Sequence, residues 1–247
     1  MWWVFYLKAN FQQRNNGVMQ IILINVVLFL MFLGIKIIGF IIGNEGIYQL
    51  LTQQLYLPAM WSLFKCKPWT LFTYCFVQEN LFPMLWSLFS LYLFGNIIRN
   101  YLGSKHFVIL YLLGGLVGGV SFLLLYNYSP IFQGVSTNLM GASPSVYAIM
   151  VGAAMIVPNF DVRLLLLGGV RMKYIVSFLI IVSLLSLTTE TAGNGVAQLG
   201  GALVGYLYSK QMKGGQKGLF TWFRDLFHQD NGLKIVRHQP RKPRDKF

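Results

Sequence analysis

The sequence predicts an all-α protein that crosses a membrane several times. Of its 247 residues, 55% are hydrophobic and 16% aromatic, but only 11% are charged. Soluble domains carry about 25% charged residues, so this composition excludes a water-soluble globule. The same apolar content excludes an intrinsically disordered chain. The apolar residues also fall into long runs separated by short polar turns, which is typical of a polytopic helical membrane protein.

Six apolar segments approach the roughly 20 residues that a membrane-spanning helix needs. They are Val18–Ile42, Leu81–Ile98, Phe107–Tyr126, Met140–Val157, Tyr174–Leu187 and Ala192–Ser209. The fourth and fifth are short, and the sixth is rich in glycine, so a re-entrant or buried helix is an alternative for it. The predicted organisation is therefore a cytoplasmic segment over 1–17, a six-span domain over 18–209 and a tail over 210–247. Because residues 1–17 show no small-residue cleavage site, we expect no cleavable signal peptide.

The connection between the first two spans, residues 43–80, is long compared with the other turns. It contains aromatic and apolar stretches, which favour an outward-facing loop that is partly embedded in the membrane. Cys66 lies in this loop and Cys75 lies beside the second span. A disulfide between them is an open alternative if the loop faces an oxidising compartment.

The charge balance first suggests a nucleic-acid partner, because 20 basic residues face only 7 acidic ones, a net charge of +13. The basic excess, however, lies in 1–17, 99–106, 158–173 and the tail, all on one side of the six-span topology. This distribution follows the positive-inside rule. We therefore expect both termini in the cytoplasm of a bacterial cell, the protein in the inner membrane, and no nucleic-acid partner.

The tail contains an aromatic amphipathic stretch, Leu219–Phe227, followed by a basic segment broken by prolines. Leu219, Phe220, Phe223, Leu226 and Phe227 would share one helical face. A helix of this kind lies in the headgroup plane. We expect the basic tail to bind anionic lipid.

Small-residue motifs recur at fixed places in the predicted spans. They are Gly141-Ala142-Ser143 at the fourth span, Gly114-Gly115 and Gly118-Gly119 in the third, Gly200-Gly201 and Gly205 in the sixth, Pro68-Trp69-Thr70 in the long loop, and Phe94-Gly95 in the second. Glycines four apart let two helices approach closely. In this order the motifs resemble the rhomboid family of intramembrane serine proteases, over roughly 61–209. The resemblance assigns helix packing to Gly141, Gly201 and Gly205.

The resemblance implies a Ser–His dyad, of which this chain keeps only one member. Ser143 stands at the nucleophile position, whereas Gln198 stands where the family has its histidine. A serine attacks an amide only when a neighbouring base takes its proton, and a neutral amide cannot do so near pH 7. The three histidines of the chain, His106, His228 and His238, all fall on the predicted cytoplasmic side, away from the expected site.

The positions that would stabilise the oxyanion also differ from the family pattern. The resemblance places Pro83 and Gln78 at histidine positions and Ser87 at an asparagine position. Proline has no donor, and a serine hydroxyl is shorter than an amide. Losing one such donor typically lowers the rate about 10²- to 10³-fold.

Ser143 and Gln198 each also have a purely structural interpretation. Ser143 could simply be a small residue that lets the fourth and sixth helices pack closely. Gln198 could donate a hydrogen bond to Ser143 or to a backbone carbonyl, because a buried amide in lipid needs a partner.

These observations favour an inactive rhomboid-like pseudoprotease that binds transmembrane helices of client membrane proteins. The alternative is an active intramembrane serine endopeptidase that uses Ser143 in a non-standard site. A small transporter or channel is a remote alternative, because the spans contain no acidic residue and show no broken-helix repeat. No cofactor and no metal is expected.

Overall fold

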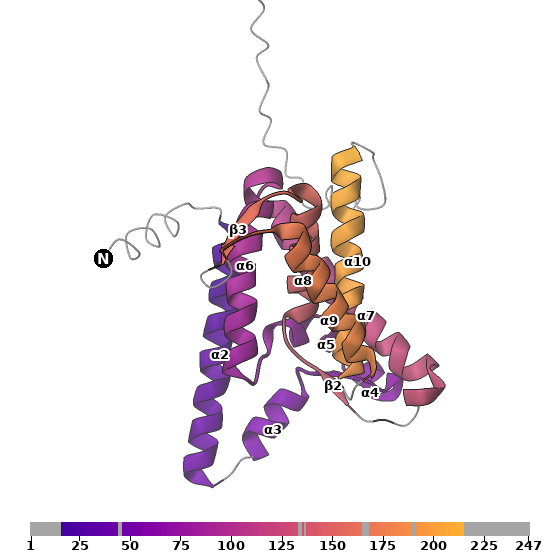
Figure 1. Cartoon of the computed structure of the whole chain (residues 1–247). Coiled ribbons are helices and arrows are strands. Elements are labelled where there is room, and N and C mark those ends of the chain that lie inside the picture. Colours follow the sequence, from indigo (N-terminus) through magenta and orange to yellow (C-terminus); the bar gives the residue numbers. More distant parts are fainter. Residues whose placement is uncertain are drawn as a thin grey trace, which may run out of the picture. The chain divides into compact units, whose positions relative to one another are not determined.

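Helices dominate the structure (Figure 1), as the apolar segments predict. The computed structural model describes residues 16–43, 46–132, 135, 137–164, 168–188 and 191–214. The predicted amphipathic helix, the tail from residue 215 onward with His228 and His238, and residues 1–15 lie outside the described residues; residues 210–214, predicted as the start of the tail, continue the last helix. Three described helices are long and apolar enough to cross a membrane: α2 (Gly17–Ile42), α6 (Leu81–Leu102) and α7 (Ser104–Tyr128). The first three predicted spans are therefore confirmed as helices, and the fold is an all-α membrane fold.

Three further helices complete the bundle, and they differ in length from the predicted spans. They are α8 (Ser143–Ile156), α9 (Met172–Leu185), which a 3₁₀ turn, η3 (Ser186–Thr188), continues, and α10 (Ala192–Gly214). α8 and the α9–η3 helix are apolar but shorter than a usual span. Residues 192–214 form one continuous helix. That all six helices cross the membrane stays a prediction.

The long loop before α6 is folded against the bundle. It holds three short helices, α3 (Gly46–Gln53), α4 (Trp61–Cys66) and α5 (Thr70–Thr73), and a 3₁₀ turn, η1 (Tyr74–Phe76). Its strand β1 (Leu57–Pro58) pairs antiparallel with β2 (Asn138–Leu139), which directly precedes α8 and follows the 3₁₀ turn η2 (Pro130–Phe132). The loop is thus tied to the segment that carries Ser143. Cys66 is exposed, Cys75 is buried, and both are free thiols, so no disulfide joins them.

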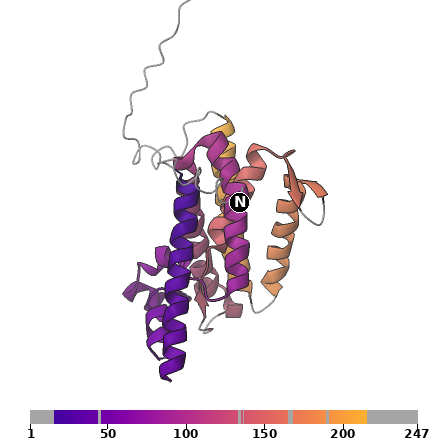
Figure 2. The ribbon, with the colours of Figure 1, turned by 90° about the vertical axis from the view of Figure 1, so that its left-hand side faces the viewer.

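A β-hairpin precedes α9 (Figure 2), where the sequence predicts only a cytoplasmic loop. Its strands β3 (Asp161–Leu164) and β4 (Gly168–Arg171) pair antiparallel, with Asp161 opposite Arg171. The alternation of polar and apolar residues in Asp161-Val162-Arg163-Leu164 was the signal for a strand.

α8 is held between α7 and α10 by glycines on both sides. A Cβ at Gly201 of α10 would overlap the backbone carbonyl of Pro144, and one at Gly205 would overlap that of Ala148. A Cβ at Gly114 or Gly118 of α7 would likewise overlap the side chains of Ala148 and Pro144 respectively. We call these contacts the glycine seam. The seam brings three helix backbones into direct contact and fixes the start of α8 in the bundle.

Candidate functional site

Ser143 is placed at the start of α8 by a tight turn. Gly141 has φ +99°, a conformation that favours glycine, and its N–H donates to the carbonyl of Tyr74 at 3.0 Å. The helix therefore begins at Ser143, three residues later than the predicted Met140. Pro144 occupies the first turn of α8, where a missing N–H leaves no hydrogen bond unmade. The hydroxyl of Ser143 has no hydrogen-bond partner among the described residues.

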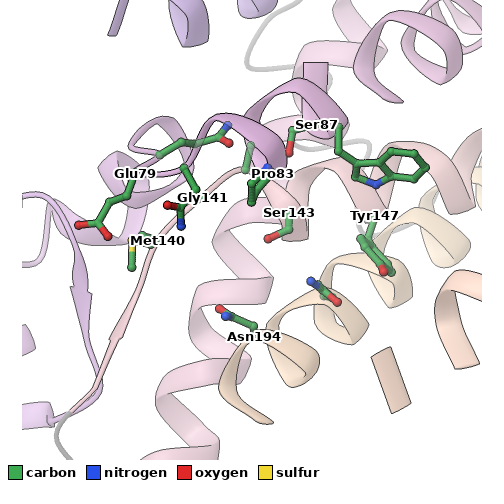
Figure 3. A pocket seen from close by; sticks show the side chains of 13 residues that line it. Glu79, Pro83, Ser87, Met140, Gly141, Ser143, Tyr147 and Asn194 are labelled. Carbon is green, nitrogen blue, oxygen red and sulfur yellow. The ribbon is translucent and has the colours of Figure 1, made fainter. Parts of the chain in front are cut away.

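A cavity of about 350 Å³ opens beside Ser143 (Figure 3). It is lined from three directions: the link between η1 and α6 together with the first turns of α6, the start of α8, and the first half of α10. The cavity is lined by every residue that the resemblance assigns to the nucleophile, the base or the oxyanion site: Gln78, Pro83, Ser87, Ser143 and Gln198. Gly141 lines it too. The structure therefore brings the sequence-predicted site residues together in one place.

Gln198 makes a structural hydrogen bond, but with neither of the two predicted partners, Ser143 or a backbone carbonyl. Its side-chain oxygen accepts from the hydroxyl of Ser183 on α9 at 2.7 Å. Within the described part of the chain no hydrogen bond joins Gln198 to Ser143, so that expectation was wrong. The reason is the position of α9, whose buried Ser183 reaches α10 at this point. The residue that the resemblance assigns to the base position is an amide, and in the structure it accepts a hydrogen bond from Ser183.

No described histidine replaces the missing base. His106 lies near the start of α7, where its Nδ1 is 2.6 Å from the hydroxyl of Tyr208 on α10. It does not line the cavity. The described residues likewise contain no group of three or more His, Cys, Asp or Glu side chains that could hold a metal ion.

The side of the cavity formed by α6 offers few donors. Pro83 is exposed and has no N–H, and Ser87 is buried and presents only a hydroxyl. Gln78 is buried with 7% of its surface exposed, and its Nε2 has no hydrogen-bond partner among the described residues. This amide is therefore a buried donor without a partner in the described part of the chain, and it belongs to a residue that lines the cavity.

Several lining residues were missed by the sequence reasoning. Asn194 lies four residues before Gln198 on α10, and Tyr147 lies four residues after Ser143 on α8. That helical spacing was the available signal, because residues four apart share one face. Tyr147 donates to the backbone oxygen of Leu179 on α9 at 3.4 Å. Both residues extend the polar lining beyond the family positions.

Glu79 was also missed, and it adds a charge to the cavity. Its carboxylate accepts a hydrogen bond from the hydroxyl of Tyr56, which follows α3. Burial and this hydrogen bond raise the pKa of Tyr56 above its usual value. Tyr56 therefore stays a neutral donor at physiological pH, and the carboxylate is held at the edge of the cavity.

The fold and the cavity define a helical integral membrane protein with a polar site beside the first turn of a buried helix. The chain belongs to the rhomboid family: residues 65–213, more than half of its length, match the model of the Rhomboid domain. No curated protein matches the sequence.

Proposed function

We propose that this protein is a rhomboid-fold pseudoprotease that binds transmembrane segments of client membrane proteins without cutting them. The observation that carries the proposal is Gln198, which occupies the general-base position and accepts a hydrogen bond from Ser183. A serine hydroxyl with no neighbouring base keeps its proton and does not attack an amide. The cavity then keeps its polar lining but lacks the proton acceptor that catalysis needs.

The polar lining supports a binding role. Ser87, Ser143 and Asn194 are neutral groups that donate and accept hydrogen bonds, and they come from three different helices. In a bilayer, a polar group of a client helix has no water to bind and gains from such partners. Hydrogen bonds between membrane helices are worth about 0.6–2 kcal/mol each, so several together would select a client with polar residues.

The proposal extends to the membrane and the lipid. We place the protein in a bacterial inner membrane with both termini in the cytoplasm, on the strength of the basic segments around the predicted spans. The basic tail would then lie on the leaflet that is rich in anionic lipid and bind it.

An active serine endopeptidase is the second candidate. The hydroxyl of Ser143, which has no partner among the described residues, favours it, together with the turn at Gly141 that presents the hydroxyl to the cavity. Labelling with a fluorophosphonate probe distinguishes the two. The purified protein and its Ser143→Ala variant should both stay unlabelled, and labelling that depends on Ser143 would contradict the pseudoprotease.

Client binding needs its own measurement. The protein in nanodiscs is titrated with a fluorescent single-span peptide of leucine and alanine that carries one asparagine, and with a matched peptide that carries leucine instead. We expect tighter binding of the asparagine peptide. Replacing Asn194 and Ser87 by alanine should remove the difference. If neither peptide binds, the protein is not a client-binding pseudoprotease of the proposed kind.

A further inference from the structure

The cavity beside Ser143 holds one charged side chain among its lining residues, Glu79. This carboxylate lies in the link between η1 and α6 and is half-buried. It accepts a hydrogen bond from Tyr56, and within the described residues no basic side chain forms an ion pair with it. A carboxylate of this kind retains a strong capacity to bind a cation.

An aromatic ring that lies within the electrostatic influence of Glu79 already contacts a cation of the chain. The ammonium of Lys36 lies 5.6 Å from the ring centre of Tyr48 on α3. Two effects raise the pKa of the Tyr48 hydroxyl: burial is the larger, and the negative charge of Glu79 is the second. Aromatic faces bind ammonium and guanidinium ions, although Tyr48 itself is not among the residues that line the cavity.

Gln78, the residue before Glu79, supplies a hydrogen-bond donor where Glu79 supplies an acceptor. The Nε2 of Gln78 is buried and without a partner among the described residues, although it lines the same cavity. A buried amide donor of this kind is unfavourable until an acceptor reaches it. Gln78 and Glu79 thus present a neutral donor and an anionic acceptor side by side.

We infer that this end of the cavity recognises a lysine or arginine side chain in the client's transmembrane segment. The cation binds the carboxylate of Glu79, and a backbone carbonyl of the client accepts from Nε2 of Gln78. A basic side chain within a spanning segment is costly to leave in lipid and pairs with an acidic group where one is offered. The inference rests on the proposed client binding and adds the chemistry of the determinant.

Two matched peptides test the inference on the full-length protein. Both are fluorescent single-span peptides of leucine and alanine, one with a lysine near one end of the apolar stretch and one with a glutamine there. The protein is reconstituted in nanodiscs of phosphatidylcholine and phosphatidylglycerol. We expect the lysine peptide to bind about tenfold more tightly, as for a partly buried charge pair.

The variant Glu79→Gln should bind both peptides equally. Its affinity for the glutamine peptide should equal that of the unmodified protein, because the amide oxygen of the new glutamine can still accept from Tyr56. Asp161→Asn removes the same charge from the β-hairpin and should keep the tenfold preference. Glu79→Lys should reverse the selection and prefer a peptide with glutamate at that position.

Each outcome is decisive. Equal binding of both peptides by the unmodified protein, or an unchanged preference in Glu79→Gln, overturns the inference but leaves client binding intact. Loss of the preference in Asp161→Asn overturns it too, because overall charge would then explain the effect. Failure to bind either of these peptides or the asparagine peptide would instead remove the proposed function itself.

Discussion

The hydroxyl of Ser183 lies 2.7 Å from the side-chain oxygen of Gln198, so a polar contact joins α9 to α10 beside the cavity. α9 otherwise turns many large apolar side chains outward, including Phe178 at 64% and Leu185 at 65% exposure. In a membrane these side chains contact lipid, which is as apolar as they are. The hydrophobic effect therefore does little to pack α9 against the other helices. The Ser183–Gln198 hydrogen bond therefore contributes to the position of α9, together with the hydrogen bond from Tyr147 to Leu179.

We expect Ser183→Ala to destabilise the protein by about 1 kcal/mol, because it leaves the oxygen of Gln198 without its donor. Unfolding measured by steric trapping in bicelles would give the value. Thr188→Ala is the control, since its hydroxyl bonds only to the nearby backbone oxygen of Leu185 at an exposed position. A double-mutant cycle with Gln198→Ala should show a coupling energy; additive effects would contradict the assignment.

The glycine seam predicts that a glycine-to-alanine substitution changes the free energy of unfolding far more within the seam than outside it. Gly201→Ala places a Cβ against the backbone carbonyl of Pro144, which cannot move without shifting α8. We expect a loss of about 2–3 kcal/mol or more. Gly34→Ala in α2 has nothing within 4 Å of the new Cβ, so it should be neutral or stabilise by up to about 1 kcal/mol. Similar unfolding free energies for the two variants would show that the seam is not tightly packed.

Restoring the missing base should not restore proteolysis. We expect Gln198→His to cleave no transmembrane peptide, because Pro83 and Ser87 supply too little to stabilise an oxyanion, and each lost donor lowers the rate about 10²- to 10³-fold. Cleavage of a quenched fluorescent single-span peptide in detergent is the measurement. The triple variant Gln198→His, Pro83→His and Ser87→Asn should be more active than the single one. Robust cleavage by Gln198→His alone would mean that the oxyanion side is already sufficient.

The two cysteines should differ in reactivity, and the exposed one reports on topology. Burial raises the pKa of the Cys75 thiol to about 11 and leaves it both inaccessible and protonated near neutral pH. Cys66 is exposed. A membrane-impermeant maleimide added outside intact spheroplasts should therefore label one site per chain.

Cys66→Ser should abolish this labelling, and Cys75→Ser should leave it unchanged. Labelling that requires permeabilised membranes would place the long loop on the cytoplasmic side and contradict the proposed orientation.

Hydropathy predicted much of the fold, because a long apolar run is nearly sufficient to form a helix in a membrane. The first helix, for example, was predicted over Val18–Ile42 and is observed over Gly17–Ile42. The hairpin at Asp161–Arg171 was missed, since its strands are too short to form an apolar run and only the alternation of polar and apolar residues over 161–164 marks them.

The sequence motifs predicted which residues gather at the candidate site, but not the hydrogen bonds that these residues make. Gly141-Ala142-Ser143 leads to the cavity at the start of α8, and Gln198, which the family pattern assigns to the same site, also lines it. The partners of the polar groups were not predictable. Which donor reaches Gln198 depends on the placement of α9, and the contact between Tyr56 and Glu79 depends on how the long loop folds back.

The glycine seam also has a consequence for how this scaffold tolerates change. Its contacts run between helix backbones and small side chains, so the framework makes almost no demand on the groups that face the cavity. Exchanging a lining residue such as Pro83 or Asn194 therefore need not weaken the packing of α7 and α10 against α8. The residues that line the cavity can therefore change one at a time for a new partner, while the contacts among α7, α8 and α10 stay the same.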